Sequence, residues 1–107
     1  MRQPRARELA LALPETEASS PHGRDDARVR GKIFVTFPPD GTLVLKTTPA
    51  DLAILTGREP EIFRRVWGER WVGVDIEPLG EERVVELLND AWRLAAPASL
   101  RRALDDD

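Results

Sequence analysis

Residues 71–97 constrain the fold most, because they join an alternating strand pattern to a long amphipathic helix pattern through a proline- and glycine-containing turn. Val72, Val74 and Ile76 recur at every second position, which predicts a strand over residues 71–76 with one apolar face. Apolar side chains recur every three or four positions from 81 to 96, which predicts a helix with a wide apolar face. A strand and a helix of this kind bury their apolar sides against each other, so a sheet covered by helices is expected.

Two further helices and four further strands are expected in the rest of the chain. Residues 4–13 begin with a proline at the first helical position, and Pro14 ends the pattern. Residues 49–57 follow Thr48, whose side chain suits a helix N-cap, and they stop near Gly57. The strand patterns cover residues 27–30, 32–37, 43–46 and 62–66, with the last an exposed edge strand.

Three local expectations follow from these patterns. Within residues 32–37, Ile33 and Val35 are expected on one face of the strand and Phe34 on the other. Arg28 and Arg30 are two apart, so they are expected on one face of the first strand, with a turn at Gly31. Residues 15–26 lack periodicity and predict a surface loop, while residues 101–107 predict a frayed tail.

The order of these patterns predicts an α+β fold in two layers, α-β-β-β-α-β-β-α, with an antiparallel sheet carrying helices on one face. The length of 107 residues suits a single domain covering residues 1–107. No apolar run approaches the ~20 residues of a membrane span, so no membrane partner is expected. The short apolar stretch of residues 9–13 follows Glu8, which argues against a signal peptide.

The chain contains no cysteine and a single histidine, His22. Disulfides, thiol catalysis and cysteine metal sites are therefore excluded, and a reducing cytoplasm is expected. His22 precedes Asp25 and Asp26, but a metal site usually needs three protein ligands on firmer ground than one loop, so no metal is expected. The sequence has neither a nucleophile elbow nor a complete phosphate-binding loop, and we expect no enzyme and no cofactor.

Arginines gather in two places although the net charge is −3 and the pI is about 5.2. Nucleic-acid binders usually carry a basic excess, so this balance argues against ordinary DNA binding while leaving local patches open. The candidate nucleic-acid-binding residues are Arg24, Arg28, Arg30 and Lys32 in a first patch, and Arg64, Arg65 and Arg70 with Trp71 in a second. Trp67 lies close by in the chain, and both tryptophans suit stacking on bases. The alternative is a solvated charged surface, with Asp25 and Asp26 neutralising the first patch and the tryptophans packing partly inside.

Five segments in a fixed order resemble the MmcQ/YjbR family of small bacterial proteins. They are LALPETE (residues 11–17), PHGR (21–24), RVRGKIFVTF (28–37), RWVGVDIE (70–77) and LLNDAWRLAAP (87–97). The resemblance implies a two-layer fold related to that of secretion chaperones, in the same element order. Members of the family are commonly labelled DNA-binding, with the phrase "double wing", but the family has no agreed site residues. DNA binding is therefore the expectation, and a non-catalytic protein-interaction or small-ligand module is the alternative.

Overall fold

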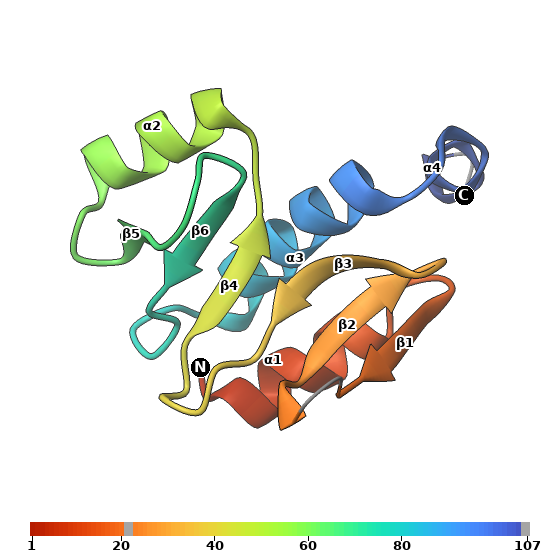
Figure 1. The fold of residues 1–107 in the computed structure, drawn as a ribbon, viewed down its shortest axis with the longest axis horizontal. Helices are drawn as coiled ribbons and strands as arrows, with labels where there is room; N and C mark the ends of the chain where they lie inside the picture. Colours follow the sequence, from red (N-terminus) through yellow and green to blue (C-terminus); the bar gives the residue numbers. More distant parts are fainter. Residues whose placement is uncertain (21–22, 106–107) are drawn as a thin grey trace.

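A computed structural model describes residues 1–20 and 23–105, which form four helices and one six-stranded antiparallel sheet (Figure 1). The helices are α1 (Gln3–Leu11), α2 (Pro49–Arg58), α3 (Glu81–Ala95) and α4 (Ala98–Asp105). The strands are β1 (Thr16–Ser19), β2 (Asp26–Val29), β3 (Lys32–Thr36), β4 (Leu43–Lys46), β5 (Phe63–Arg65) and β6 (Trp71–Val74). Their order in the sheet is β1-β2-β3-β4-β6-β5. The predicted α+β class with an antiparallel sheet is confirmed.

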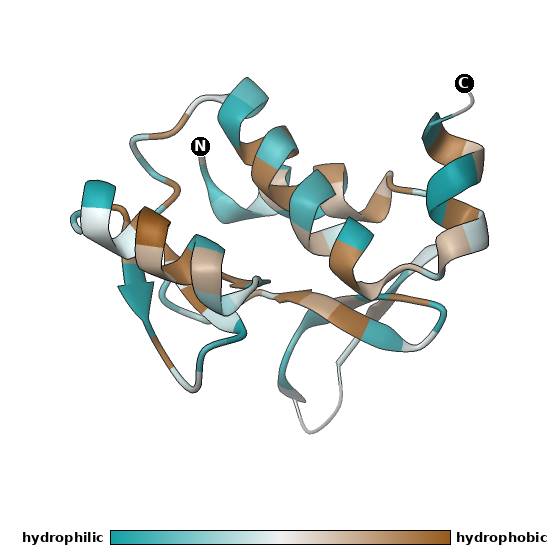
Figure 2. Ribbon diagram, turned by 90° about the horizontal axis from the view of Figure 1, so that it is seen from above, coloured by the Kyte–Doolittle hydropathy of each residue, from teal (hydrophilic) through white to brown (hydrophobic). Residues whose placement is uncertain are grey.

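The helices form a second layer on one face of the sheet, with α3 lying across β3 and β4 and packing against α1 (Figure 2). Helix α2 contacts β5 near the edge of the sheet. No described helix packs on the opposite face, which we call the helix-free face. Within the described ranges, no helix is both long and apolar enough to cross a bilayer.

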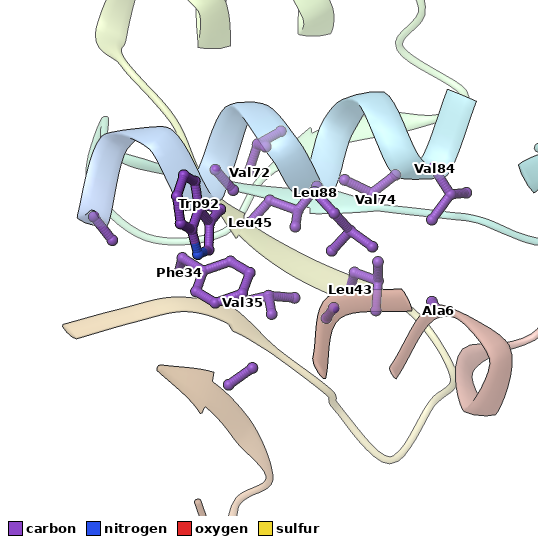
Figure 3. Packing of buried hydrophobic residues seen from close by; sticks show 14 of the residues in the cluster. Ala6, Phe34, Val35, Leu43, Leu45, Val72, Val74, Val84, Leu88 and Trp92 are labelled. Atoms are coloured by element: carbon purple, nitrogen blue, oxygen red, sulfur yellow. The ribbon is translucent and has the colours of Figure 1, made fainter. Parts of the chain in front are cut away.

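The core lies between α3 and the sheet. Leu88 and Trp92 point from α3 toward Leu43 and Leu45 of β4 (Figure 3), and all four side chains are buried. The indole Nε1 of Trp92 donates a hydrogen bond to the carbonyl of Pro14 at 3.1 Å, so its one polar atom is satisfied inside the core. The apolar stripe read from the sequence is therefore the face that holds α3 on the sheet.

A β-bulge changes the alternation of β3. Ala27 pairs with Val35 and Arg28 with Ile33, which leaves Phe34 without a partner. Because the extra residue interrupts the alternation, Phe34 and Val35 are both buried, and Phe34 lies beside Trp92 (Figure 3). The expectation that Phe34 faces away from Val35 is wrong for this reason.

Strand β2 ends at Val29, and Arg30 and Gly31 form the turn to β3 with φ angles of 48° and 82°. Positive φ at both central residues is typical of the tight turns that match the twist of a hairpin. The predicted turn at Gly31 is present, but Arg30 belongs to the turn and not to the strand. Arg28 and Arg30 therefore do not share a strand face as the sequence suggested.

Two described segments differ from their predictions. The expected loop over residues 15–26 contains β1, which pairs with β2 from Thr16 opposite Val29 to Ser19 opposite Asp26. An edge strand needs only backbone pairing, so a polar sequence without periodicity can form one. The expected frayed tail begins within α4, where Leu100 packs in the core and the Arg101 guanidinium donates to the Arg93 carbonyl. The predicted element order is thus extended by β1 and α4.

Candidate functional site

The β5–β6 hairpin at the edge of the sheet divides the second arginine patch. In its register, Phe63 lies opposite Val74, Arg64 opposite Gly73 and Arg65 opposite Val72. Val72 belongs to the core under the helices, so Arg65 is on the helix-covered side and Arg64 is on the helix-free face. The two neighbouring arginines therefore cannot serve one ligand side by side.

Gly73 lets side chains of the edge strand lie across β6. A Cβ at this position would be 2.8 Å from Val66 Cγ1, which is closer than real Cβ atoms approach, and 3.0 Å from Arg64 Cγ, which is tighter than most Cβ contacts. Val44 pairs with Gly73 on the same face and is only 2 % exposed although no helix covers it. The missing side chain at position 73 thus allows the stem of Arg64 to lie flat on the helix-free face.

Two tryptophans and a lysine lie together at the tip of this hairpin. The ring centroids of Trp67 and Trp71 are 6.3 Å apart with the planes tilted by 42°, and Lys46 Nζ is 5.2 Å from the Trp71 ring centroid. Lys46 pairs with Trp71 across β4 and β6. Lys46 follows Leu45 and Trp71 precedes Val72. Because Leu45 and Val72 belong to the core under the helices, strand alternation places Lys46 and Trp71 on the helix-free face. The Trp67 side chain is 54 % exposed. We call Lys46, Arg64, Trp67 and Trp71 the hairpin platform.

The charge of the platform is partly compensated. Arg64 lies 3.8 Å from Asp40, a loose ion pair. The hydroxyl and amide of Thr42 donate to Asp40 and, together with the weaker attraction of Arg64, hold the pKa of that carboxyl below its usual value. Arg70 is exposed, but it directly precedes Trp71, so the alternation of the strand directs it to the other side.

Arg28 and Arg30, two of the four residues of the first arginine patch, are neutralised within the fold. Arg28 makes two hydrogen bonds to Asp26, at 3.0 and 3.1 Å, and the Asp26 side chain is almost fully buried. Arg30 makes two bonds of 3.0 Å to Glu15. Such bidentate pairs occupy the donors that a phosphate would need. The anticipated neutralisation therefore comes from Asp26 and Glu15, whereas Asp25 lies 3.5 Å from Arg7 instead.

The two patches do not form one surface. Arg28 on β2 and Arg64 on β5 both face the helix-free side, but β3, β4 and β6 lie between their strands. At about 4.8 Å per strand, four strand steps separate them by roughly 19 Å. Arg24 and Lys32 are exposed and make no ion pair among the described residues. Of the residues proposed from the sequence, Arg64 and Trp71 lie on the same face of the β5–β6 hairpin.

Sequence reasoning did not select Lys46, although it is central to the platform. It ends an apolar strand and is separated from Trp71 by a helix and another strand, so nothing local connects the two. Only the adjacency of β4 and β6 places its ammonium over the indole. Trp67 could have been selected from the sequence, because an aromatic residue beside Gly68 in a charged hairpin loop is not predicted to be buried.

Within residues 1–20 and 23–105, no group of three His, Cys, Asp or Glu side chains lies close enough together to hold an ion. His22, the histidine considered from the sequence, falls outside the described residues.

Comparisons with known proteins identify the family. Two solved structures share the fold: a Deinococcus radiodurans protein of domain family DUF419 (TM-score 0.79, 19 % identity, covering 98 % of this chain and 89 % of that one) and a Pseudomonas syringae protein (TM-score 0.71, 16 % identity, covering 90 % and 100 %). No curated protein matches the chain. The YjbR family model matches residues 11–94. The chain therefore belongs to the YjbR family, as its sequence segments suggested.

Proposed function

We propose that this protein is a non-catalytic binder of single-stranded nucleic acid, and of single-stranded DNA in particular, at the hairpin platform. The observation that carries the proposal is the tilted pair of Trp67 and Trp71 with Lys46 over one ring, on the sheet face that no described helix covers. Stacking on an aromatic side chain contributes about 1–3 kcal/mol per base and does not depend on the base sequence. Lys46 and Arg64 supply cations for the neighbouring phosphates.

The distribution of charge favours single strands over duplexes. Duplex binding gains affinity by neutralising many phosphates, and here Arg28 and Arg30 are already occupied by carboxylates. A single strand offers its bases to the tryptophans and needs fewer cations, which suits a chain of net charge −3. The absence of cysteine agrees with action in the cytoplasm.

Fluorescence anisotropy with a labelled oligothymidine of about 12 nucleotides, a length within the usual range for single-strand sites, tests the proposal. We expect binding in low salt, and about tenfold weaker binding for Trp67→Ala, because one stacked base is lost at ~1.4 kcal/mol. Since two cations, Lys46 and Arg64, face the oligonucleotide, the slope of log K against log salt should be shallow, about −1.4.

Arg30→Ala is the matched control, because Arg30 lies in a different hairpin and is held by Glu15. It should leave the affinity unchanged. The proposal fails if about 100 μM protein, far above the concentration expected for specific binding, gives no anisotropy change. It also fails if Arg30→Ala weakens binding as much as Trp67→Ala does.

A further inference from the structure

A groove lies between α2 and α3 on the helix-covered side of the sheet, and Lys46 of the hairpin platform is among the residues that line it. Its volume is about 390 Å³. Leu45 and Val72 form the floor, and Ile54 and Leu94 stand on the two walls. Ile54 is 50 % exposed and Leu94 is 40 % exposed. With Trp67, they are the large apolar side chains that the described part of the chain leaves most open to solvent, so the groove is an apolar surface of unusual exposure.

The walls of the groove carry unbalanced negative charge. Asp51 on α2 and Glu86 and Asp90 on α3 line it, and none of the three forms an ion pair with another described residue. Three cations also line it: Arg83 lies 2.7 Å from Glu59, Arg93 pairs with Asp105, and Lys46 forms no ion pair with a described residue. What remains for a ligand is therefore an apolar floor bordered by three carboxylates and one lysine without such partners, an excess of two negative charges.

The surroundings of Asp90 disfavour the ionised form of its carboxyl group. Desolvation by its surroundings raises its pKa above the ordinary value, and the charges of Glu86 and Asp51 raise it further, while Arg93 opposes the shift. A cation placed between the walls would lower the repulsion among the three carboxylates.

We propose that this groove docks an amphipathic helix of another protein, whose apolar stripe is flanked by lysine or arginine. Ile54 on α2 and Leu94 on α3 stand on opposite walls, so the apolar stripe of a helix laid along the groove can contact both. The free carboxylates select basic flanking residues, and they disfavour a second copy of this chain, whose net charge is −3. Apart from Lys46, which lines the groove and also belongs to the platform, the two sites use different residues, so variants of Ile54, Leu94 or Trp67 remove one site without the other.

The test uses two helical peptides of about 14 residues, or four turns, with the same leucine pattern. One peptide has lysine and the other has glutamate at all the positions that leucine does not occupy. Isothermal titration of the full chain should show binding of the lysine peptide at least tenfold tighter than that of the glutamate peptide. Ile54→Ser and Leu94→Ser should each weaken it at least fivefold, and Glu86→Gln with Asp90→Asn about tenfold. These positions are exposed or at the surface, and thermal unfolding checks that each variant folds.

Two matched variants serve as controls. Glu82→Gln removes an exposed carboxylate of α3 that is outside the groove, and Trp67→Ala removes the exposed apolar side chain of the platform. Both should bind the lysine peptide like the parent protein, so a failure of the platform proposal leaves this test unaffected. NMR shift changes should be centred on α2 and α3.

Several outcomes overturn the docking proposal. Among them are no binding of the lysine peptide, equal binding of both peptides, and equal weakening by Glu82→Gln and by the groove variants. Sedimentation showing a dimer that Ile54→Ser dissociates would identify a second copy as the occupant. If hexylamine displaced the lysine peptide and bound the groove as tightly as the peptide does, the groove would be a small-molecule site instead of a helix site.

Discussion

At the scale of single residues, Gly73 decides whether the edge hairpin can lie flat. A Cβ there would meet Val66 and Arg64 at 3.0 Å or less. Gly73→Ala should lower the free energy of unfolding by about 1–2 kcal/mol, because the β-branched Val66 has little freedom to move away. Urea denaturation measures the change. Gly73→Ala should also weaken oligonucleotide binding, since it displaces Arg64.

Val66→Ala provides the control for this close contact. Added to Gly73→Ala, it should restore part of the lost stability, which makes the two changes non-additive in a double-mutant cycle. Equal stability of Gly73→Ala and the parent protein would contradict the role assigned to the glycine.

At the scale of elements, the β2–β3 hairpin depends on a turn with positive φ at Arg30 and Gly31. A Cβ at Gly31 meets no atom within 4 Å, so the cost of Gly31→Ala is backbone strain alone, about 1 kcal/mol. Gly57→Ala in α2 is the matched substitution, also in open space, and should stabilise by about 0.5–1 kcal/mol because alanine favours a helix. Urea denaturation should therefore move in opposite directions for the two variants.

At the scale of the whole molecule, two kinds of carboxylate respond oppositely to pH. Hydrogen bonds from Arg83 lower the pKa of Glu59, so its contribution to stability is present above about pH 4.3, the unfolded value, and is lost as the pH falls through the lowered pKa. The pKa of Asp90 is raised, so its ionised form opposes folding at neutral pH, and acidification through that pKa removes the penalty.

Thermal unfolding at pH 7 and at about pH 3, below both ordinary carboxyl pKa values, separates the two groups. Asp90→Asn should raise the melting temperature at pH 7, and Glu59→Gln should lower it. Both differences should shrink at the lower pH. A destabilised Asp90→Asn at pH 7 would show that this carboxylate supports the fold instead of straining it.

The sequence by itself determined the family, the α+β class and most elements to within a few residues, because these depend on local apolar spacing and on turn and cap chemistry. The helix over residues 81–96 is the clearest case, since its apolar stripe is the side that α3 buries. Strand β1 and helix α4 escaped prediction because backbone pairing and docking of Leu100 on the core hold them, not their own periodicity.

Only the tertiary structure decided which charges remain free and which residues meet. Arg28 and Arg30 looked available in the sequence, but folding brings Asp26 and Glu15 to them. Lys46 looked incidental, but the pairing of β4 with β6 sets it over Trp71. The physical reason is that apolar periodicity is a property of neighbours along the chain. Ion pairs and cross-strand contacts instead join residues whose distance in space depends on the order of the strands.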